Sequence, residues 1–112
     1  MDFKEAGEAH RNWKVRLRTF VHGGGEALDE ATVRRDDACT LGKWLHTLEP
    51  GQRTGDVEEM FALHAKFHRH AAEVVAAARQ GQREQALRML DAGTPYADTS
   101  FRLIGMLGRL NG

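Results

Sequence analysis

Near the middle of the sequence stands the stretch LHAKFHRH, residues 63–70. His64 and His68 are four residues apart, so on an α-helix they lie one turn apart on the same face. Phe67 shares that side of the helix with His64, which indicates that the face is at least partly buried. Two imidazoles on such a face can bind a metal ion, and the rest of the sequence supplies further candidate ligands.

The length and composition indicate one small domain, residues 1–112. The 16 basic and 16 acidic residues balance, so no charge excess points to nucleic acid or to an anionic membrane surface. No apolar run approaches the roughly 20 residues of a membrane-spanning helix, and the first residues lack the apolar core of a signal peptide. The single cysteine excludes an internal disulfide. We therefore expect a soluble cytoplasmic protein with a reduced thiol.

The first helix is predicted from about residue 2 to about residue 21. Its apolar residues alternate in steps of three and four, as on a helix packed in a bundle. His10 falls on this apolar seam, between Ala6 and Trp13. The glycines at positions 23–25 end the pattern.

The second predicted helix is short, from about residue 37 to residue 48, and carries Cys39 near its start. The charged segment before it is predicted as a loop with a helical turn at residues 26–31. Gly42 lies inside the short helix, where glycine costs roughly 1 kcal/mol relative to alanine. We expect the compensation to be close approach of another backbone or of a metal site.

Two longer helical patterns follow. Asp56 and Glu59 predict a capping box at the start of the third helix, which ends at Gly81 and carries the two histidines of the opening stretch on its buried face. The fourth helix runs from about residue 82 to about residue 110, with a kink or a short break expected at Pro95.

These patterns predict an all-α fold, an antiparallel four-helix bundle with a short second helix. Because the second helix cannot cover the full length of the third, apolar surface should remain uncovered. A symmetric homodimer would bury that surface.

Four side chains at core-facing positions form a candidate metal site: His10, Cys39, His64 and His68. Three imidazoles and one thiolate suit tetrahedral Zn²⁺. Zinc would also explain polar side chains at core positions, because a single ion satisfies all of them. A nearby carboxylate would lower the cost of burying the net positive charge. The sequence leaves three candidates for that role: Asp36, Asp37 and Glu73.

Each of these features also has a simpler interpretation. Two histidines four residues apart are common on helices, and a lone cysteine is more often an inert core residue than a ligand. Trp13 and Trp44 are most simply core aromatics. The remaining histidines, His22, His46 and His70, are predicted at the surface. Only the combination of four candidate ligands favours a metal site.

Three segments, in this order, resemble the chemoreceptor zinc-binding domain family: HRNWK at 10–14, CTLGKWL at 39–45 and HAKFH at 64–68. The resemblance implies that His10, Cys39, His64 and His68 are zinc ligands and that the fold is a helical bundle forming a symmetric homodimer. It also implies a regulatory module of bacterial cytoplasmic signalling, whose zinc occupancy alters a chemotaxis receptor or diguanylate cyclase output domain. That partner would be attached in cis or bound in trans, and some family members respond to hypochlorous acid through the zinc-bound cysteine.

We therefore expect a zinc-responsive regulatory domain and no enzymatic activity. Four protein ligands would close a site that catalytic zinc keeps open for water. Ala65 also stands where a His-Glu-x-x-His hydrolase has its general base. Two alternatives remain open. One is a redox sensor acting through the zinc-bound thiolate of Cys39, and the other is a helical dimerisation module with structural zinc.

Overall fold

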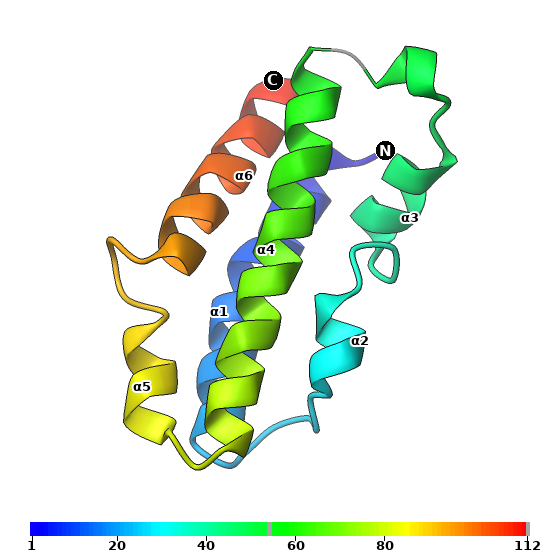
Figure 1. Cartoon of the computed structure of the whole chain (residues 1–112). Helices are drawn as coiled ribbons and strands as arrows, with labels where there is room; N and C mark the ends of the chain where they lie inside the picture. The colour runs from blue at the N-terminus through cyan, green and yellow to red at the C-terminus, as the bar shows by residue number, and fades with distance from the viewer. Residues whose placement is uncertain (54, 112) are drawn as a thin grey trace.

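The computed structural model describes residues 1–53 and 55–111, which form α-helices and one 3₁₀ turn, with no β-strand among them (Figure 1). The helices of this described part are α1 (Phe3–Val21), α2 (Glu30–Arg34), α3 (Thr40–Thr47), α4 (Asp56–Arg79), α5 (Arg83–Arg88) and α6 (Pro95–Asn111). The 3₁₀ turn is η1 (Pro50–Gln52). The all-α prediction is therefore confirmed. None of the described helices is long and apolar enough to cross a membrane.

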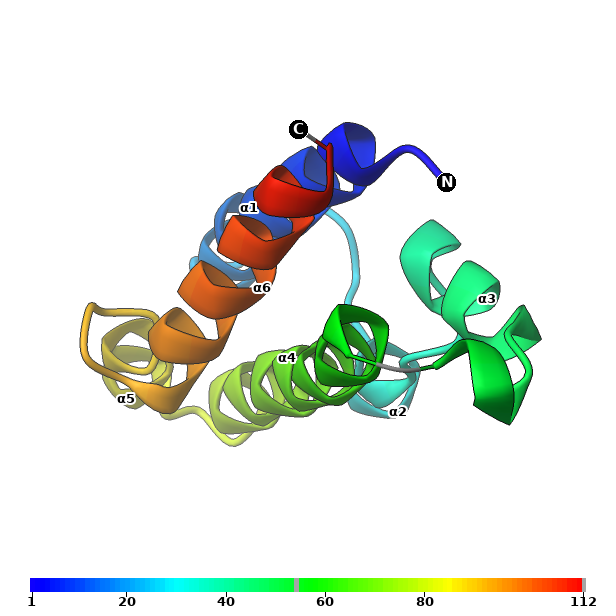
Figure 2. The same cartoon turned by 90° about the horizontal axis from the view of Figure 1, so that it is seen from above.

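Three long helices, α1, α4 and α6, form the body of the molecule. In Figure 1, α1 and α4 run in the same direction and α6 runs opposite to both. α6 packs against α1 and α4, while the short α2 packs against α4. Figure 2 shows α3 on one side of α4, with α5 and α6 on the other. α3 corresponds to the second helix predicted from about residue 37 to residue 48.

The boundaries of α1 and α6 follow from local sequence. The Asp2 carboxylate accepts a hydrogen bond from the Glu5 amide at 3.0 Å and caps α1. The predicted fourth helix is divided into α5 and α6 by a turn in which Gly93 has a φ of 88°. At the start of α6 the Thr94 hydroxyl accepts from the Ala97 amide at 3.2 Å. The break expected at Pro95 therefore lies immediately before it.

Two local predictions were wrong. The helical turn predicted at 26–31 lies further along the chain as α2, because the Asp29 carboxylate accepts from the Thr32 amide at 3.0 Å and starts the helix there. The capping box predicted at Asp56 does not form. Gly55, with a φ of 56°, is the residue before the helix, and Asp56 already belongs to its first turn.

A continuous apolar core lies between the long helices and extends to α2 and α3. Its fully buried large side chains include Leu17, Leu41, Met60, Phe67, Leu103 and Leu107. Within this core His10, His64 and His68 are only 2 %, 1 % and 2 % exposed. Buried imidazoles need polar partners, because an unsatisfied polar group in an apolar interior is costly.

Candidate metal centre

Three helices bring four side chains to one point in the core. His10 comes from the middle of α1, His64 and His68 from successive turns of α4, and Cys39 from the residue that caps α3. One potential ligand atom from each of the four lies within 4.8 Å of every other. We call these four side chains the donor cluster. The sequence predicted all four, and the structure brings them together.

The separations within the donor cluster fit a tetrahedral zinc ion. The Sγ atom of Cys39 lies 3.1 Å from Nε2 of His64 and 3.6 Å from Nε2 of His68. It lies 3.9 Å from Nε2 of His10, and the Nε2 atoms of His64 and His68 are 3.1 Å apart. Zinc bonds of about 2.0–2.1 Å to nitrogen and about 2.3 Å to sulfur place neighbouring ligands roughly 3.4 to 3.6 Å apart. These four distances bracket those values, and the two remaining pairs, which join His10 to His64 and to His68, lie within 4.8 Å.

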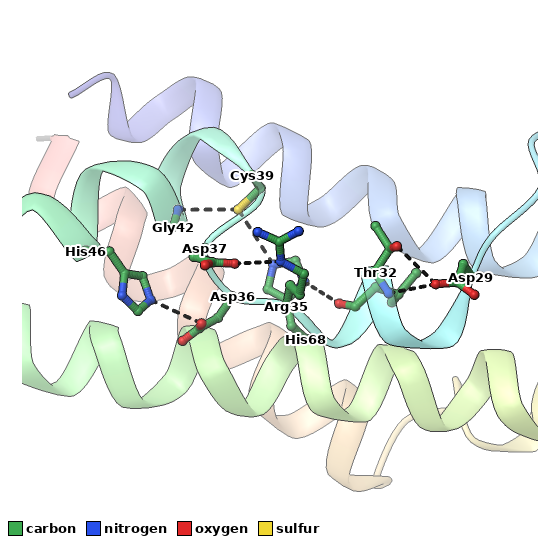
Figure 3. A network of polar contacts seen from close by, with 10 residues as sticks. Asp29, Thr32, Arg35, Asp36, Asp37, Cys39, Gly42, His46 and His68 are labelled. Atoms are coloured by element: carbon green, nitrogen blue, oxygen red, sulfur yellow. Dashed lines mark hydrogen bonds and ion pairs between the residues drawn. The ribbon is translucent and has the colours of Figure 1, made fainter.

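Backbone carbonyls orient two of the imidazoles. Nδ1 of His10 lies 2.8 Å from the carbonyl oxygen of Ala6, and Nδ1 of His68 lies 3.0 Å from that of Val33. The His68 contact is among the interactions drawn in Figure 3. A carbonyl can only accept, so each Nδ1 carries the proton and donates it. Each Nε2 therefore keeps a lone pair directed at the cluster, as a metal ligand requires.

Burial also sets the protonation states of the donor cluster. Loss of hydration lowers the pKa of His10 to about 4. It lowers the pKa of His64 to about 2, with a further contribution from the neighbouring imidazoles, and it lowers the pKa of His68 as well. The three imidazoles are thus neutral at pH 7. Burial raises the pKa of the Cys39 thiol, an effect that a bound divalent cation reverses because it favours the thiolate.

Gly42 allows α3 to approach the donor cluster. Its amide donates to Sγ of Cys39 at 3.4 Å (Figure 3). A Cβ atom at this position would lie 1.8 Å from the carbonyl oxygen of Asp36 and 3.0 Å from Cε1 of His64. The close approach predicted for Gly42 is therefore present, to both the backbone and a candidate ligand.

Asp36 is the acidic residue that acts on the donor cluster. Its carboxylate pairs with Nε2 of His46 at 3.1 Å, and its charge opposes the fall that burial causes in the pKa of His68. The other two carboxylates considered from the sequence are engaged elsewhere. Asp37 pairs with Arg35 at 3.0 Å and Glu73 with His70 at 2.7 Å.

The sequence did not reveal the two carbonyl partners of the imidazoles. Ala6 lies one helical turn before His10, so that contact could have been anticipated from helix geometry. The carbonyl of Val33 comes from a separate segment and has no sequence signature. Of the three histidines predicted at the surface, His22 and His46 are exposed and His70 is half-buried.

Comparison with known protein families supports this interpretation of the site. The model of the chemoreceptor zinc-binding domain matches residues 10–75, a range that contains the whole donor cluster. Neither a curated protein nor a solved structure matches the chain.

Proposed function

This chain belongs to the chemoreceptor zinc-binding domain family, and we propose that it is a zinc-binding regulatory domain of bacterial signalling. The proposed ligands are the donor cluster: His10, Cys39, His64 and His68. The observation that carries the proposal is the meeting of three buried imidazoles and one thiol at separations suited to one tetrahedral ion. Zinc would hold the ligands of α1, α3 and α4 together without taking part in redox chemistry itself.

The placement of the donor cluster suggests how occupancy could act on the fold. His64 and His68 are fixed relative to each other on α4, whereas Cys39 belongs to the start of α3. α3 stands to the side of the body in Figure 2. Filling the site would fasten α3 to α1 and α4, and emptying it would release α3. We propose that this rearrangement is the signal read by an output domain in cis or in trans.

The same arrangement favours regulation over catalysis. Four protein ligands complete a tetrahedral zinc ion, whereas catalytic zinc keeps a position for water or substrate. We also propose that residues 1–112 act as one cytoplasmic domain and assemble as a symmetric homodimer of antiparallel bundles. α6 packs against both α1 and α4, which favours a single unit. The exposure of Val15 (60 %) and Phe101 (80 %) favours a partner surface.

Zinc stoichiometry tests the ligand assignment. We expect one zinc per chain in protein purified without added metal, measured by elemental analysis. Cys39→Ala and His68→Ala should lower that ratio strongly, because each removes one of four ligands. His22→Ala is the matched control, since His22 is exposed and lies outside the cluster. Unchanged zinc content in both ligand variants would falsify the assignment.

The exposure of Cys39 favours redox sensing as a second candidate function. Cys39 is half-buried, whereas the three imidazoles of the cluster are buried. A metal-bound thiolate is nucleophilic, and oxidation to the sulfenic acid would weaken its hold on zinc. We expect hypochlorous acid or hydrogen peroxide, at one equivalent, to release zinc and add one oxygen atom to the Cys39 peptide in mass spectra. If both the zinc content and the peptide mass stay constant, this candidate is wrong.

A further inference from the structure

Two cavities reach the donor cluster, and both are lined by a pair of α1 side chains, Trp13 and Arg16. One cavity, of about 340 Å³, is lined by His10 and Cys39. The other, of about 400 Å³, is lined by Cys39 and His68. Trp13 and Arg16 line both cavities, as do Ala38 and Cys39, so the Arg16 side chain borders both approaches to the cluster.

Arg16 is held over Trp13 by two interactions. Its guanidinium carbon lies 3.7 Å from the centre of the Trp13 ring, a cation–π contact. Its Nε atom lies 3.3 Å from a carboxylate oxygen of Glu26, and its terminal nitrogen pairs with the other oxygen. Glu26 belongs to the loop between α1 and α2, so the ion pair ties that loop to α1. The Trp13 ring in turn packs edge-on against His68, with ring centres 5.9 Å apart.

We propose that Arg16, pinned by Glu26 and stacked on Trp13, is a gate that sets how fast zinc and small thiol reagents reach the donor cluster. This inference rests on the proposed function and names the route into the same site. Arg16 is a positioning residue, because it contacts Trp13 and Glu26 and none of the four donors. The Arg16 side chain is 33 % exposed and lies over the buried Trp13 ring, so it has room to turn toward solvent.

The energetics of the two contacts predict a gate that opens readily. An exposed ion pair and one cation–π contact are each weak, so their loss should accelerate access roughly three- to thirtyfold. A barrier on the route slows uptake and release alike. Its removal therefore changes rates much more than it changes the zinc content at equilibrium.

Two rates test the gate, both measured on the full chain. The first is transfer of zinc to excess 4-(2-pyridylazo)resorcinol, followed by absorbance. The second is alkylation of Cys39 by neutral iodoacetamide in metal-free protein, followed by mass spectrometry. Arg16→Ala should raise both rates roughly three- to thirtyfold. Glu26→Gln should raise them by a smaller factor, because it keeps the Arg16 charge and stacking but removes the ion pair.

Controls distinguish loss of the gate from a general loosening of the fold and from a failure of the protein to bind zinc. Arg18→Ala, at an exposed α1 position outside both cavities, should leave both rates unchanged. Added salt should accelerate wild type but not Arg16→Ala, because salt weakens the exposed ion pair. The gate proposal is overturned if Arg16→Ala keeps the wild-type rates of zinc transfer and alkylation, or if Arg18→Ala accelerates both rates equally. A wild type that holds no zinc overturns the proposed function instead, and alkylation rates then decide the gate alone.

Discussion

A methyl group at Gly42 would test whether the close approach of α3 builds the metal site. The Cβ atom of Gly42→Ala would lie 1.8 Å from the carbonyl oxygen of Asp36 and 2.7 Å from its carbonyl carbon. Carbon and oxygen atoms in weak contact are normally about 3.3 Å apart or more, so the two segments must separate by roughly 1.5 Å. The obstacle is backbone, which cannot rotate away as a flexible side chain can.

The expected loss of unfolding free energy in Gly42→Ala follows from two opposing effects. Alanine inside a helix gains about 1 kcal/mol over glycine. Overpacking costs about 1–3 kcal/mol, and a clash with backbone belongs at the upper end of that range. We expect a net destabilisation of about 2 kcal/mol in metal-free protein. Zinc affinity should fall by about 10- to 100-fold, because separating α3 from the Asp36 segment and His64 moves Sγ of Cys39 by more than metal geometry tolerates.

Urea unfolding in the presence of EDTA measures the stability, and competition with a chelator of known affinity measures zinc binding. The matched control is Gly105→Ala in α6, where a Cβ atom would meet nothing within 4 Å. That variant should be neutral or more stable by up to about 1 kcal/mol, with unchanged zinc affinity. If Gly42→Ala behaves like Gly105→Ala in both assays, the close approach of α3 does not build the site.

Two further predictions concern the buried side chains around the cluster. In metal-free protein the pKa of His10 is about 4 and that of His64 about 2, both below the ordinary value of 6.5. The unfolded chain therefore binds protons first, so stability is highest above pH 6.5 and falls as the pH is lowered. Between pH 7.5 and pH 5, urea titrations should show a loss of about 2 kcal/mol from each of these two imidazoles, and a flat profile would contradict the burial argument. Phe67→Ala should cost about 3–5 kcal/mol of unfolding free energy, because Phe67 is fully buried against His10 and His68. Lys66→Ala, at the exposed residue just before it on α4, should change it by less than about 0.5 kcal/mol; similar losses in the two variants would show that Phe67 is not a core residue.

The sequence predicted the parts of the fold that depend on long periodic patterns. The helices over 3–21 and 56–79 lie within a few residues of the predicted ranges, because each buries a continuous apolar face. The five-residue helix α2 was misplaced, since so short an element has no periodicity and is set by one capping carboxylate, that of Asp29. The break before Pro95 was predicted because proline cannot continue a helix.

The sequence also predicted the membership of the donor cluster, but not its surroundings. Histidine and cysteine at core-facing positions are chemically conspicuous, whereas the carbonyl of Val33 that orients His68 belongs to the backbone. The contact between Arg16 and Glu26 spans ten residues and a glycine-rich turn. No helical spacing relates those two positions, so only the folded chain reveals the pair.

The Sγ atom of Cys39 has neighbours of two different kinds. Sγ of Cys39 both faces the three imidazoles and accepts the Gly42 amide at the first turn of α3. A change in the charge of that sulfur therefore reaches the backbone of α3 directly. The Gly42 N–H signal in a nitrogen–proton NMR spectrum should consequently act as a built-in reporter, shifting whenever the sulfur is metallated, protonated or oxygenated.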